Sequence, residues 1–221
     1  MIEGLIFDFD GLIIDTELCY CQSVQEMYRE FRCEVPPQFF TSLGSSDLFD
    51  PYDYLAAQGH QFDREMLSGQ RRRRHHQLVT AQPLLPGVME YLQTSKRLGL
   101  KLGLASSSTR EWVVSHLTRT GLLHFFDCIK TADDVQYTKP DPELFLAALS
   151  ALRLPNSQAI VLEDSPNGIL AAQGANIFSV AVPSQLTRQL SFHRAGLVLD
   201  SLSDISLEDL LAKVDARKEF G

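Results

Sequence analysis

The sequence has few of the features that mark secreted, disulfide-bonded or membrane-spanning proteins. Four cysteines in 221 residues are too few for a disulfide-rich scaffold. Cys19 and Cys21 have no second cysteine pair with which to complete a zinc site. No apolar run reaches the ~18 residues that a membrane span needs, and the opening residues lack the basic segment of a signal peptide. We therefore expect reduced thiols and a cytoplasmic protein.

Basic residues are also scarce relative to acidic ones. The chain has 20 Lys and Arg against 28 Asp and Glu, a formal net charge of −8. This balance disfavours a broad surface for nucleic acid or for an anionic membrane. The hydrophobic share of 44% and the charged share of 22% are ordinary for a globular protein, which excludes a disordered chain or a fibre. The length is about one and a half times a typical domain of roughly 150 residues.

Short apolar runs predict the strands of a parallel sheet. Each run is apolar on both faces, as is typical of strands that are covered by helices on both sides. The runs lie at residues 2–7, 100–105, 159–162, 178–182 and, more weakly, 197–199.

Helix signals alternate with these runs. Ser108 or Thr109 can begin a helix that stops at Gly121. Asp141-Pro142 and Ser165-Pro166 each combine a capping side chain with a proline at the first helical position. This alternation from about residue 84 onward predicts a doubly wound, Rossmann-like α/β sheet.

The segment between residues 16 and 80 differs from the rest because it contains no convincing strand. Its patterns favour helices at 16–31, 37–43, 51–58 and 63–79, and Pro83 and Pro86 mark its end. We predict an α-helical subdomain over residues 15–83, called the cap below, inserted into a core of residues 1–14 and 84–221. Removing the cap leaves about one ordinary α/β domain.

Polar side chains follow several of the predicted strands. Because ligands of open parallel sheets bind beyond the carboxyl ends of the strands, we expect these side chains to converge there. They are Asp8 and Asp10, Ser106 to Ser108, Lys139, and Glu163 and Asp164.

The charge of this group points to a metal. Two carboxylates 4 Å apart repel by about 4 kcal/mol at an effective dielectric constant of 20. Lys139 offsets one negative charge, and a hard divalent cation would offset two more. Oxygen ligands favour Mg²⁺ over zinc. A carboxylate nucleophile, a nearby acid/base, a cation and a phosphate cradle together indicate phosphoryl transfer through an aspartyl-phosphate.

The same residues resemble the four motifs of the haloacid dehalogenase-like hydrolases, in order and along nearly the whole chain. The matching segments are DFDGLIIDTE at 8–17, LASSS at 104–108, TKPDPELF around Lys139, and LEDSPNG at 162–168. The cap falls where one cap type of this family is inserted.

The resemblance implies a role for each matching residue. Asp8 would be the nucleophile and a metal ligand, and Asp10 the general acid and then base, with its carbonyl on Mg²⁺. Ser106 and Lys139 would bind the transferring phosphoryl group, with Ser107 as a backbone donor. Asp164 would ligate Mg²⁺. Glu163 would either lie behind the metal ligands or bind the ion through a water molecule. In the cap, Gly44 and Ser45 are the expected substrate contacts.

The resemblance leaves the reaction open. Asp10 argues against dehalogenation, because true dehalogenases lack an acid at that position. The expected activity is a phosphatase that acts on a small phosphorylated metabolite, such as a sugar phosphate or a phosphoglycolate-like monoester. A β-phosphoglucomutase-like phosphomutase is the alternative, although Tyr20, Ser45 and Thr109 stand where similar mutases carry other residues. A binding module without turnover is the third possibility.

Other features allow two interpretations. The run from Arg71 to Arg74 is either a solvated surface or places one arginine in the cleft to hold an anionic substrate. Trp112 is either helix packing or an aromatic near the phosphate site. Asp15 to Glu17 begin the cap helix and are candidates for control of cap closure. We expect a monomer or weak dimer.

Overall fold

The computed structural model describes residues 1–42 and 49–219. Within them, one six-stranded sheet has the order β3-β2-β1-β4-β5-β6, and all of its neighbouring strands pair in parallel. The expected doubly wound α/β sheet is therefore confirmed. The strands are β1 (Gly4–Phe7), β2 (Lys101–Ala105), β3 (Cys128–Lys130), β4 (Ala159–Glu163), β5 (Phe178–Ala181) and β6 (Leu197–Val198).

The strand order places a topological switch point beside β1. Phe7 is in register with Leu104 of β2 on one side and with Leu162 of β4 on the other. The chain proceeds from β1 to β2 and β3, and then crosses to β4, β5 and β6. Strands that diverge in this way leave a crevice at their carboxyl ends, where ligands of such sheets bind.

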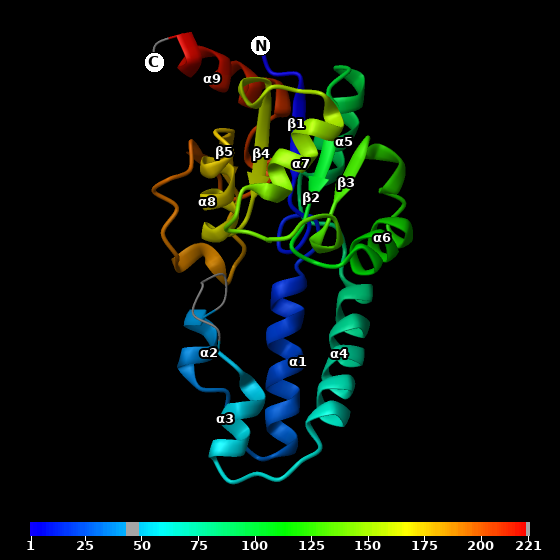
Figure 1. Cartoon of the computed structure of the whole chain (residues 1–221), viewed down its shortest axis with the longest axis vertical. Coiled ribbons are helices and arrows are strands. Elements are labelled where there is room, and N and C mark those ends of the chain that lie inside the picture. Colours follow the sequence, from blue (N-terminus) through cyan, green and yellow to red (C-terminus); the bar gives the residue numbers. More distant parts are fainter. Residues whose placement is uncertain (43–48, 220–221) are drawn as a thin grey trace.

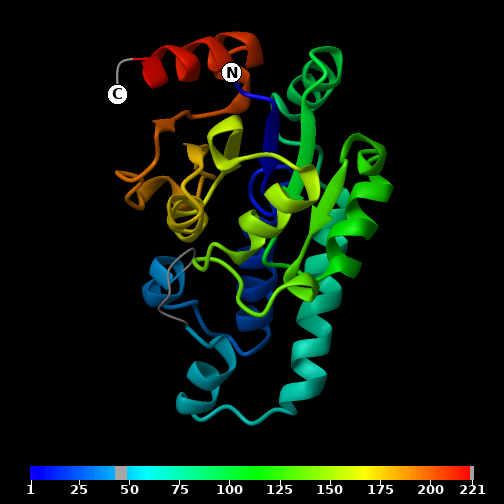
Figure 2. The same ribbon diagram turned by 45° about the horizontal axis from the view of Figure 1, so that its top comes forward.

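Helices cover both faces of the sheet. Helices α7 (Glu143–Leu152) and α8 (Pro166–Gly174) pack on one face, and their position in front of the strands can be followed in Figures 1 and 2. Helices α5 (Val88–Arg97), α6 (Arg110–Arg119) and α9 (Leu207–Glu219) contribute to the apolar cluster of the other face. This burial explains why the strands are apolar on both sides.

Alternation along β1 shows how one strand serves both faces. Leu5 and Phe7 belong to the cluster under α5 and α9, whereas Ile6 between them belongs to the cluster under α7 and α8. All three side chains are fully buried, and each contributes roughly 1.5–3 kcal/mol of burial free energy. The end of β1 is therefore held firmly where Asp8 follows.

The cap helices lie beyond the carboxyl ends of the strands (Figure 1). They have an apolar cluster of their own, in which Tyr28 is fully buried and donates a hydrogen bond to the Pro51 carbonyl oxygen at 2.8 Å. The helical character of this segment agrees with the prediction, and the division of the chain at residues 15 and 83 stays a prediction. The helices are α1 (Thr16–Glu30), α2 (Pro37–Ser42), α3 (Pro51–Ala57) and α4 (Arg64–Ala81).

The structure adds elements that the sequence patterns did not predict. Strand β3 has three residues at the sheet edge, each only half-buried, so it lacks a strong apolar run. Helices α5 and α9 were not predicted either. Helix α7 begins at Glu143, one residue later than expected from an Asp141 cap, although Asp141 still accepts a hydrogen bond from the Glu143 amide at 2.9 Å. Among the described residues, no helix has the length and apolarity to cross a membrane.

Candidate active site

Lys139 holds the carboxylate that follows β1. Its ammonium group donates hydrogen bonds to Asp8 Oδ1, to the Ala105 carbonyl oxygen at 2.8 Å and to Glu163 Oε1 at 2.5 Å. The Lys139 side chain is only 5% exposed, so the three donors of the ammonium are all used inside the protein. The lysine therefore fixes Asp8 and Glu163 on either side of one positive charge.

Asp164 stands next to this ion pair and completes an acidic cluster. Asp8, Glu163 and Asp164 each offer one carboxylate oxygen, and these oxygens lie within 4.8 Å of one another. Asp164 Oδ2 is buried and has no hydrogen-bond partner among the described residues. Glu163 is better satisfied, because the amide and hydroxyl of Ser165 both donate to its Oε2 at 3.0 Å. A buried carboxylate oxygen without a partner is a ligand available to a cation.

Two glycines allow the backbone to approach this cluster. Gly11 has a φ of +77°, and a Cβ at this position would lie 2.2 Å from Asp164 Oδ2. A Cβ on Gly168 would lie 1.8 Å from the carboxyl carbon of Glu163. Both distances are shorter than any van der Waals contact, so the glycines of the first and fourth motifs are required by the geometry.

The pKa values show that negative charge is incompletely compensated here. Burial raises the pKa of Asp8 well above its usual value, Lys139 lowers it, and Glu163 and Asp10 raise it further. Burial also raises the pKa of Asp164, and repulsion from Glu17 and Glu163 adds to the rise. Burial by itself would lower the pKa of Lys139, but the two carboxylates it contacts raise it above its usual value. The single positive charge of Lys139 therefore does not neutralise all the carboxylates of this cluster.

The donor set fits a hard divalent cation. Asp8, Glu163 and Asp164 all offer carboxylate oxygens, and one of these oxygens is buried without a partner among the described residues. The raised pKa values of Asp8 and Asp164 indicate that a positive charge would be stabilising here. Cations such as Mg²⁺ take oxygen ligands of this kind. The expected acidic cluster is therefore present.

Asp10 is held away from the lysine by a different set of donors. Its Oδ1 accepts a hydrogen bond from Trp112 Nε1 at 3.0 Å. Its Oδ2 accepts hydrogen bonds from the Ser108 hydroxyl at 2.6 Å and from the Ser106 hydroxyl at 3.3 Å. The sequence offered Trp112 either as helix packing or as an aromatic near the phosphate site, but it did not predict this hydrogen bond to Asp10.

These groups line one cavity at the switch point of the sheet. The cavity has a volume of about 330 Å³. It brings together all the expected site residues of the core and adds Glu17 from α1, which the sequence had assigned only to the cap hinge. Gly44 and Ser45, the expected substrate contacts of the cap, lie outside the described residues. The lining residues are Asp8, Asp10, Glu17, Ser106, Ser107, Ser108, Lys139, Glu163, Asp164, Ser165 and Asn167.

Glu17 increases the negative charge of the cavity. Burial raises the pKa of Glu17 to about 7, with repulsion from Asp10 as the next contribution, while a hydrogen bond from Ser184 at 3.3 Å lowers it. Glu17 belongs to the first turn of α1. A residue of the cap thus shares the electrostatic environment of the core carboxylates.

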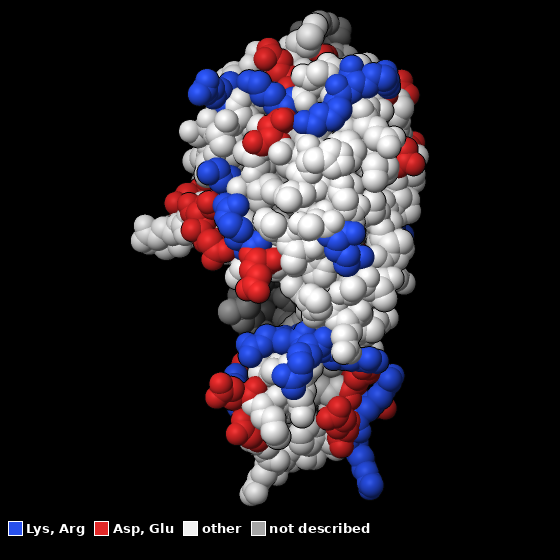
Figure 3. Space-filling view, turned by 90° about the vertical axis from the view of Figure 1, so that its right-hand side faces the viewer, with Lys and Arg blue, Asp and Glu red and all other residues white. Residues whose placement is uncertain are grey.

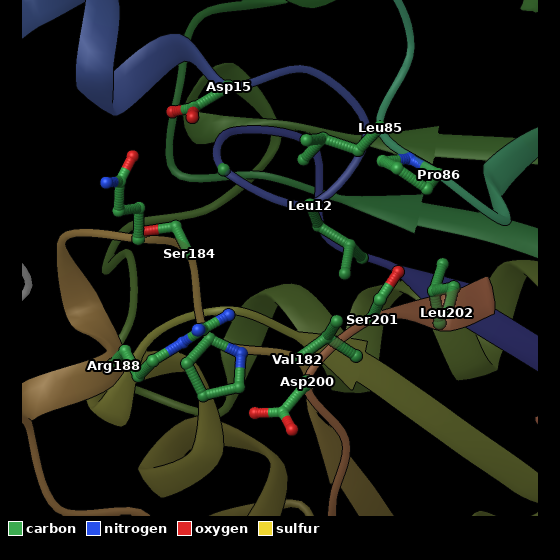
Figure 4. Close-up of a pocket in the computed structure, with 13 residues that line it drawn as sticks. Leu12, Asp15, Leu85, Pro86, Val182, Ser184, Arg188, Asp200, Ser201 and Leu202 are labelled. Atoms are coloured by element: carbon green, nitrogen blue, oxygen red, sulfur yellow. The ribbon is translucent and has the colours of Figure 1, made fainter. Parts of the chain in front are cut away.

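A separate pocket of about 240 Å³ lies beside the two chain segments that join the cap to the core. Figure 4 shows Asp15 and Leu85, one from each of these segments, on one side, and Arg188 and Asp200 on the other. Asp8, Asp10, Glu163 and Asp164 do not line this pocket. It is distinct from the cavity that Asp8 and Asp10 line, and it adjoins these two segments.

The comparisons with known proteins identify the family. A family model for haloacid dehalogenase-like hydrolases matches residues 5–182. The chain belongs to this family. The matched range contains every core residue of the cavity, so the resemblance that the four motifs indicated is confirmed.

Relatives of this hydrolase include proteins that are named as phosphatases. The Bacillus subtilis (strain 168) protein "Putative phosphatase YhcW" is 39% identical over 98% of this chain and 100% of its own length. Hexitol phosphatase B of Escherichia coli (strain K12) is 30% identical, with 95% and 97% covered. The expected enzyme class, a hydrolase of this family with phosphatase relatives, is confirmed.

Solved structures of the family share the fold. A β-phosphoglucomutase from Clostridium difficile has a TM-score of 0.76 and 27% identity, covering 98% of this chain and 99% of its own. CbbY from Rhodobacter sphaeroides, solved with phosphate, has a TM-score of 0.73 and 26% identity, covering 92% and 96%. The chain is thus similar both to phosphatases and to phosphomutases of this family.

Proposed function

We propose that this protein is a magnesium-dependent phosphatase that hydrolyses a small phosphorylated metabolite through an aspartyl-phosphate. The observation that carries the proposal is the division of the carboxylates into two groups. Asp8 is joined with Glu163 and Asp164 around Lys139, whereas Asp10 is held separately by Trp112 and Ser108. One carboxylate is therefore placed for attack and the other for proton transfer.

In the first half-reaction, a carboxylate oxygen of Asp8 attacks the phosphorus atom, and the bond to the leaving oxygen breaks. Asp10, in its protonated form, gives its proton to that oxygen, so that a neutral alcohol departs. Lys139 compensates the charge of Asp8 and of the phosphoryl group, and Ser106 and Ser107 line the space that the phosphoryl oxygens would take. The product of this step is phospho-Asp8.

In the second half-reaction, water cleaves phospho-Asp8. Asp10, now ionised, accepts a proton from the water molecule as it attacks phosphorus, which releases inorganic phosphate and restores the Asp8 carboxylate. The proton taken from water replaces the one that left with the alcohol, so both residues return to their starting state.

Asp8 and Asp164 would hold the metal ion, together with the Asp10 carbonyl oxygen. Glu163 would lie behind these ligands. When bound, Mg²⁺ supplies positive charge that stabilises the phosphoryl oxygens and lowers the repulsion between phosphate and Asp8. The buried, unpartnered oxygen of Asp164 among the described residues supports this assignment.

The substrate class is supported by the relatives and by the cavity. The relatives include Hexitol phosphatase B and Validoxylamine A 7'-phosphate phosphatase, whose names specify small phosphorylated compounds. A cavity of about 330 Å³ accommodates a phosphoryl group and part of a small metabolite. We propose in addition that residues 15–83 move as a cap over this cavity, because α1 carries Glu17 into it.

Phosphate release by Asp8→Asn and wild-type protein tests the proposal. We expect the wild type to release phosphate from sugar phosphates and from p-nitrophenyl phosphate when Mg²⁺ is present, and to lose activity with excess chelator. Asp8→Asn removes the nucleophile with little change in shape, and we expect a loss of at least about 10³-fold. Turnover by Asp8→Asn, or full activity in chelator, would exclude the mechanism.

The similarity to a β-phosphoglucomutase structure keeps phosphomutase activity as the second candidate. A mutase returns the phosphoryl group to a sugar, whereas a phosphatase transfers it to water. Supplying a sugar phosphate with its bisphosphate, and measuring isomer and free phosphate in the same sample, separates the two reactions.

A further inference from the structure

A second cavity adjoins the catalytic one on the side of Asp10. It has a volume of about 510 Å³ and lies between α4 of the cap and α6 of the core. We call it the α4–α6 pocket. Asp10, Ser107 and Ser108 line both cavities, so the two are continuous at the proposed acid/base. The lining residues are Asp10, Arg71, Arg72, His75, His76, Ser107, Ser108, Thr109 and Trp112.

The arginines of α4 differ in whether they pair with an acidic residue. Arg64 pairs with Asp50 and Asp53, and Arg74 pairs with Glu26, all at the cap surface. Arg71 and Arg72, which line the pocket, form no ion pair with a carboxylate in the described part of the chain. Figure 3 shows a band of Lys and Arg side chains across the cap where it meets the core.

The two pocket arginines differ in how firmly they are held. The guanidinium of Arg71 donates from Nε to the Tyr52 hydroxyl at 2.9 Å and lies 4.8 Å from the centre of the Tyr20 ring. Both neighbours are neutral, so the charge of Arg71 stays uncompensated by them. Arg72 is exposed and faces the pocket. In a chain with a net charge of −8, two such arginines beside the active site favour an anion.

The histidines of the pocket add polar and aromatic surface to this charge. His75 Nε2 donates to the Thr16 carbonyl oxygen at 3.0 Å, and its ring stacks on Trp112 with 5.1 Å between the centroids. Burial lowers the pKa of His75, although the Thr16 hydrogen bond raises it in part. His75 is therefore neutral at neutral pH, and the permanent positive charge of the pocket comes from Arg71 and Arg72.

Asp10 is the only carboxylate among the residues that line the pocket, and donors from Trp112 and Ser108 occupy its two oxygens. The pocket is thus positive at the α4 end and begins at the residue that would protonate the leaving oxygen. We propose that the α4–α6 pocket binds the leaving part of the substrate, and that Arg72, assisted by Arg71, selects a leaving alcohol that carries a second anionic group. The inference rests on the proposed phosphatase function.

Matched pairs of substrates test this selection. Gluconate 6-phosphate and glucitol 6-phosphate differ only in a carboxylate against a CH₂OH group, and so do 3-phosphoglycerate and glycerol 3-phosphate. We expect kcat/KM to favour the acid of at least one pair by roughly tenfold or more, the value of a charge-assisted hydrogen bond. Equal or higher kcat/KM for both neutral partners would overturn the proposal.

Two neighbouring arginines supply the variant and its control. Arg72→Gln should reduce the acid-to-alcohol ratio of kcat/KM to near one. Arg73→Gln removes the same charge from the same helix, but Arg73 is exposed and does not line the pocket. We expect Arg73→Gln to keep the wild-type ratio. An equal fall of the ratio in both variants would show a general charge effect and would also overturn the proposal.

Binding measurements separate this inference from the proposed function. Calorimetry on Asp8→Asn protein measures binding of the same pairs without turnover. If neither pair is hydrolysed by the wild type but the acid binds Asp8→Asn protein more tightly, the phosphatase proposal fails and the pocket assignment stands. If phosphate is released but neither rate nor binding distinguishes the partners, the pocket assignment fails and the phosphatase proposal stands.

Discussion

Trp112 Nε1 donates a hydrogen bond to Asp10 Oδ1 across 3.0 Å, which connects helix α6 to the proposed acid/base. The same ring stacks on His75 of the cap and packs against His116 of α6, with centroid separations of 5.1 and 4.3 Å. One side chain therefore contacts the cap, the core and the residue that would move the proton. The position of Asp10 is tied to that of α4.

Replacing Trp112 by Phe tests this relationship. The variant keeps an aromatic ring but loses the N–H donor, so Asp10 is less firmly oriented. We expect kcat on sugar phosphates to fall about tenfold. This is part of the roughly 10²–10⁴-fold increase in rate that general acid–base catalysis supplies. The fall should be smaller with p-nitrophenyl phosphate, because nitrophenolate leaves without a proton.

Steady-state kinetics on both substrates give the comparison. KM should change less than kcat, since the lost donor contacts Asp10 and not the phosphoryl group. If kcat fell equally for the two leaving groups, Trp112 would be a structural residue and would not position the acid.

Lys139→Met tests the buried charge arrangement. The methionine is of similar length but leaves Asp8 and Glu163 without the ammonium that they share. Removing one partner of a buried ion pair costs roughly 3–5 kcal/mol, so urea unfolding should show a clear loss of stability. Activity should also fall by at least about 10²-fold, because the lysine compensates the charge of Asp8 and phosphate.

The double variant Lys139→Met/Glu163→Gln separates the two effects. Removing the charge of Glu163 should restore part of the stability but not the activity. A single variant that kept both wild-type stability and wild-type turnover would contradict the role of Lys139.

Gly11→Ala tests the close approach of backbone and metal cluster. Gly11 and Gly121 have nearly the same φ, +77° and +72°, but a Cβ on Gly121 would meet nothing within 4 Å. Gly121→Ala should therefore show only the backbone strain, roughly 1–2 kcal/mol. Gly11→Ala should in addition displace Asp164, so the Mg²⁺ concentration for half-maximal activity should rise.

Titrations of activity with Mg²⁺, together with urea unfolding of both variants, provide the measurement. Equal Mg²⁺ requirements in the two variants would mean that the contact with Asp164 relaxes without affecting the metal.

His116→Phe tests a pH effect on stability. His116 is 1% exposed, and its ring nitrogens have no hydrogen-bond partner among the described residues. Burial, followed by repulsion from Arg119 and His76, lowers its pKa from 6.5 to about 4. Between these values the unfolded chain binds more protons than the fold does, so the His116 contribution destabilises the protein as pH falls from 6.5 towards 4.

Phenylalanine removes this titration but keeps the ring. The free energy of unfolding, measured with urea from about pH 4 to 7, should fall less steeply with acid in His116→Phe than in the wild type. His75 also has a lowered pKa, but it is present in both proteins and its contribution cancels in the comparison. Parallel pH profiles would contradict the assignment.

Much of the fold could be predicted because its signals are local. Apolar runs between helix caps identified five of the strands, and Ser165-Pro166 marked the start of α8. Strand β3 was missed because a half-buried edge strand of three residues needs no apolar run. Helix α5 begins at Val88, and its N-cap residue Gly87 has no side chain to cap it, so it gave no comparable signal.

The candidate site could also be predicted only in part. The strand-end position of Asp8, Asp10, Lys139 and Asp164 follows from the parallel sheet, since its carboxyl ends share one edge. The contribution of Glu17 could not be predicted, because it depends on the angle at which α1 leaves the core.

The sequence by itself determined the α/β sheet and the motif residues at its carboxyl edge, since hydrophobic periodicity, caps and motif order act over short stretches of chain. Only the tertiary structure decided that Trp112 holds Asp10, and that Arg71 and Arg72 line a pocket while Arg74 pairs with Glu26. The physical reason is that these contacts join elements up to 102 residues apart in the chain, and the packing of α4 against the core fixes which face of each helix meets the site.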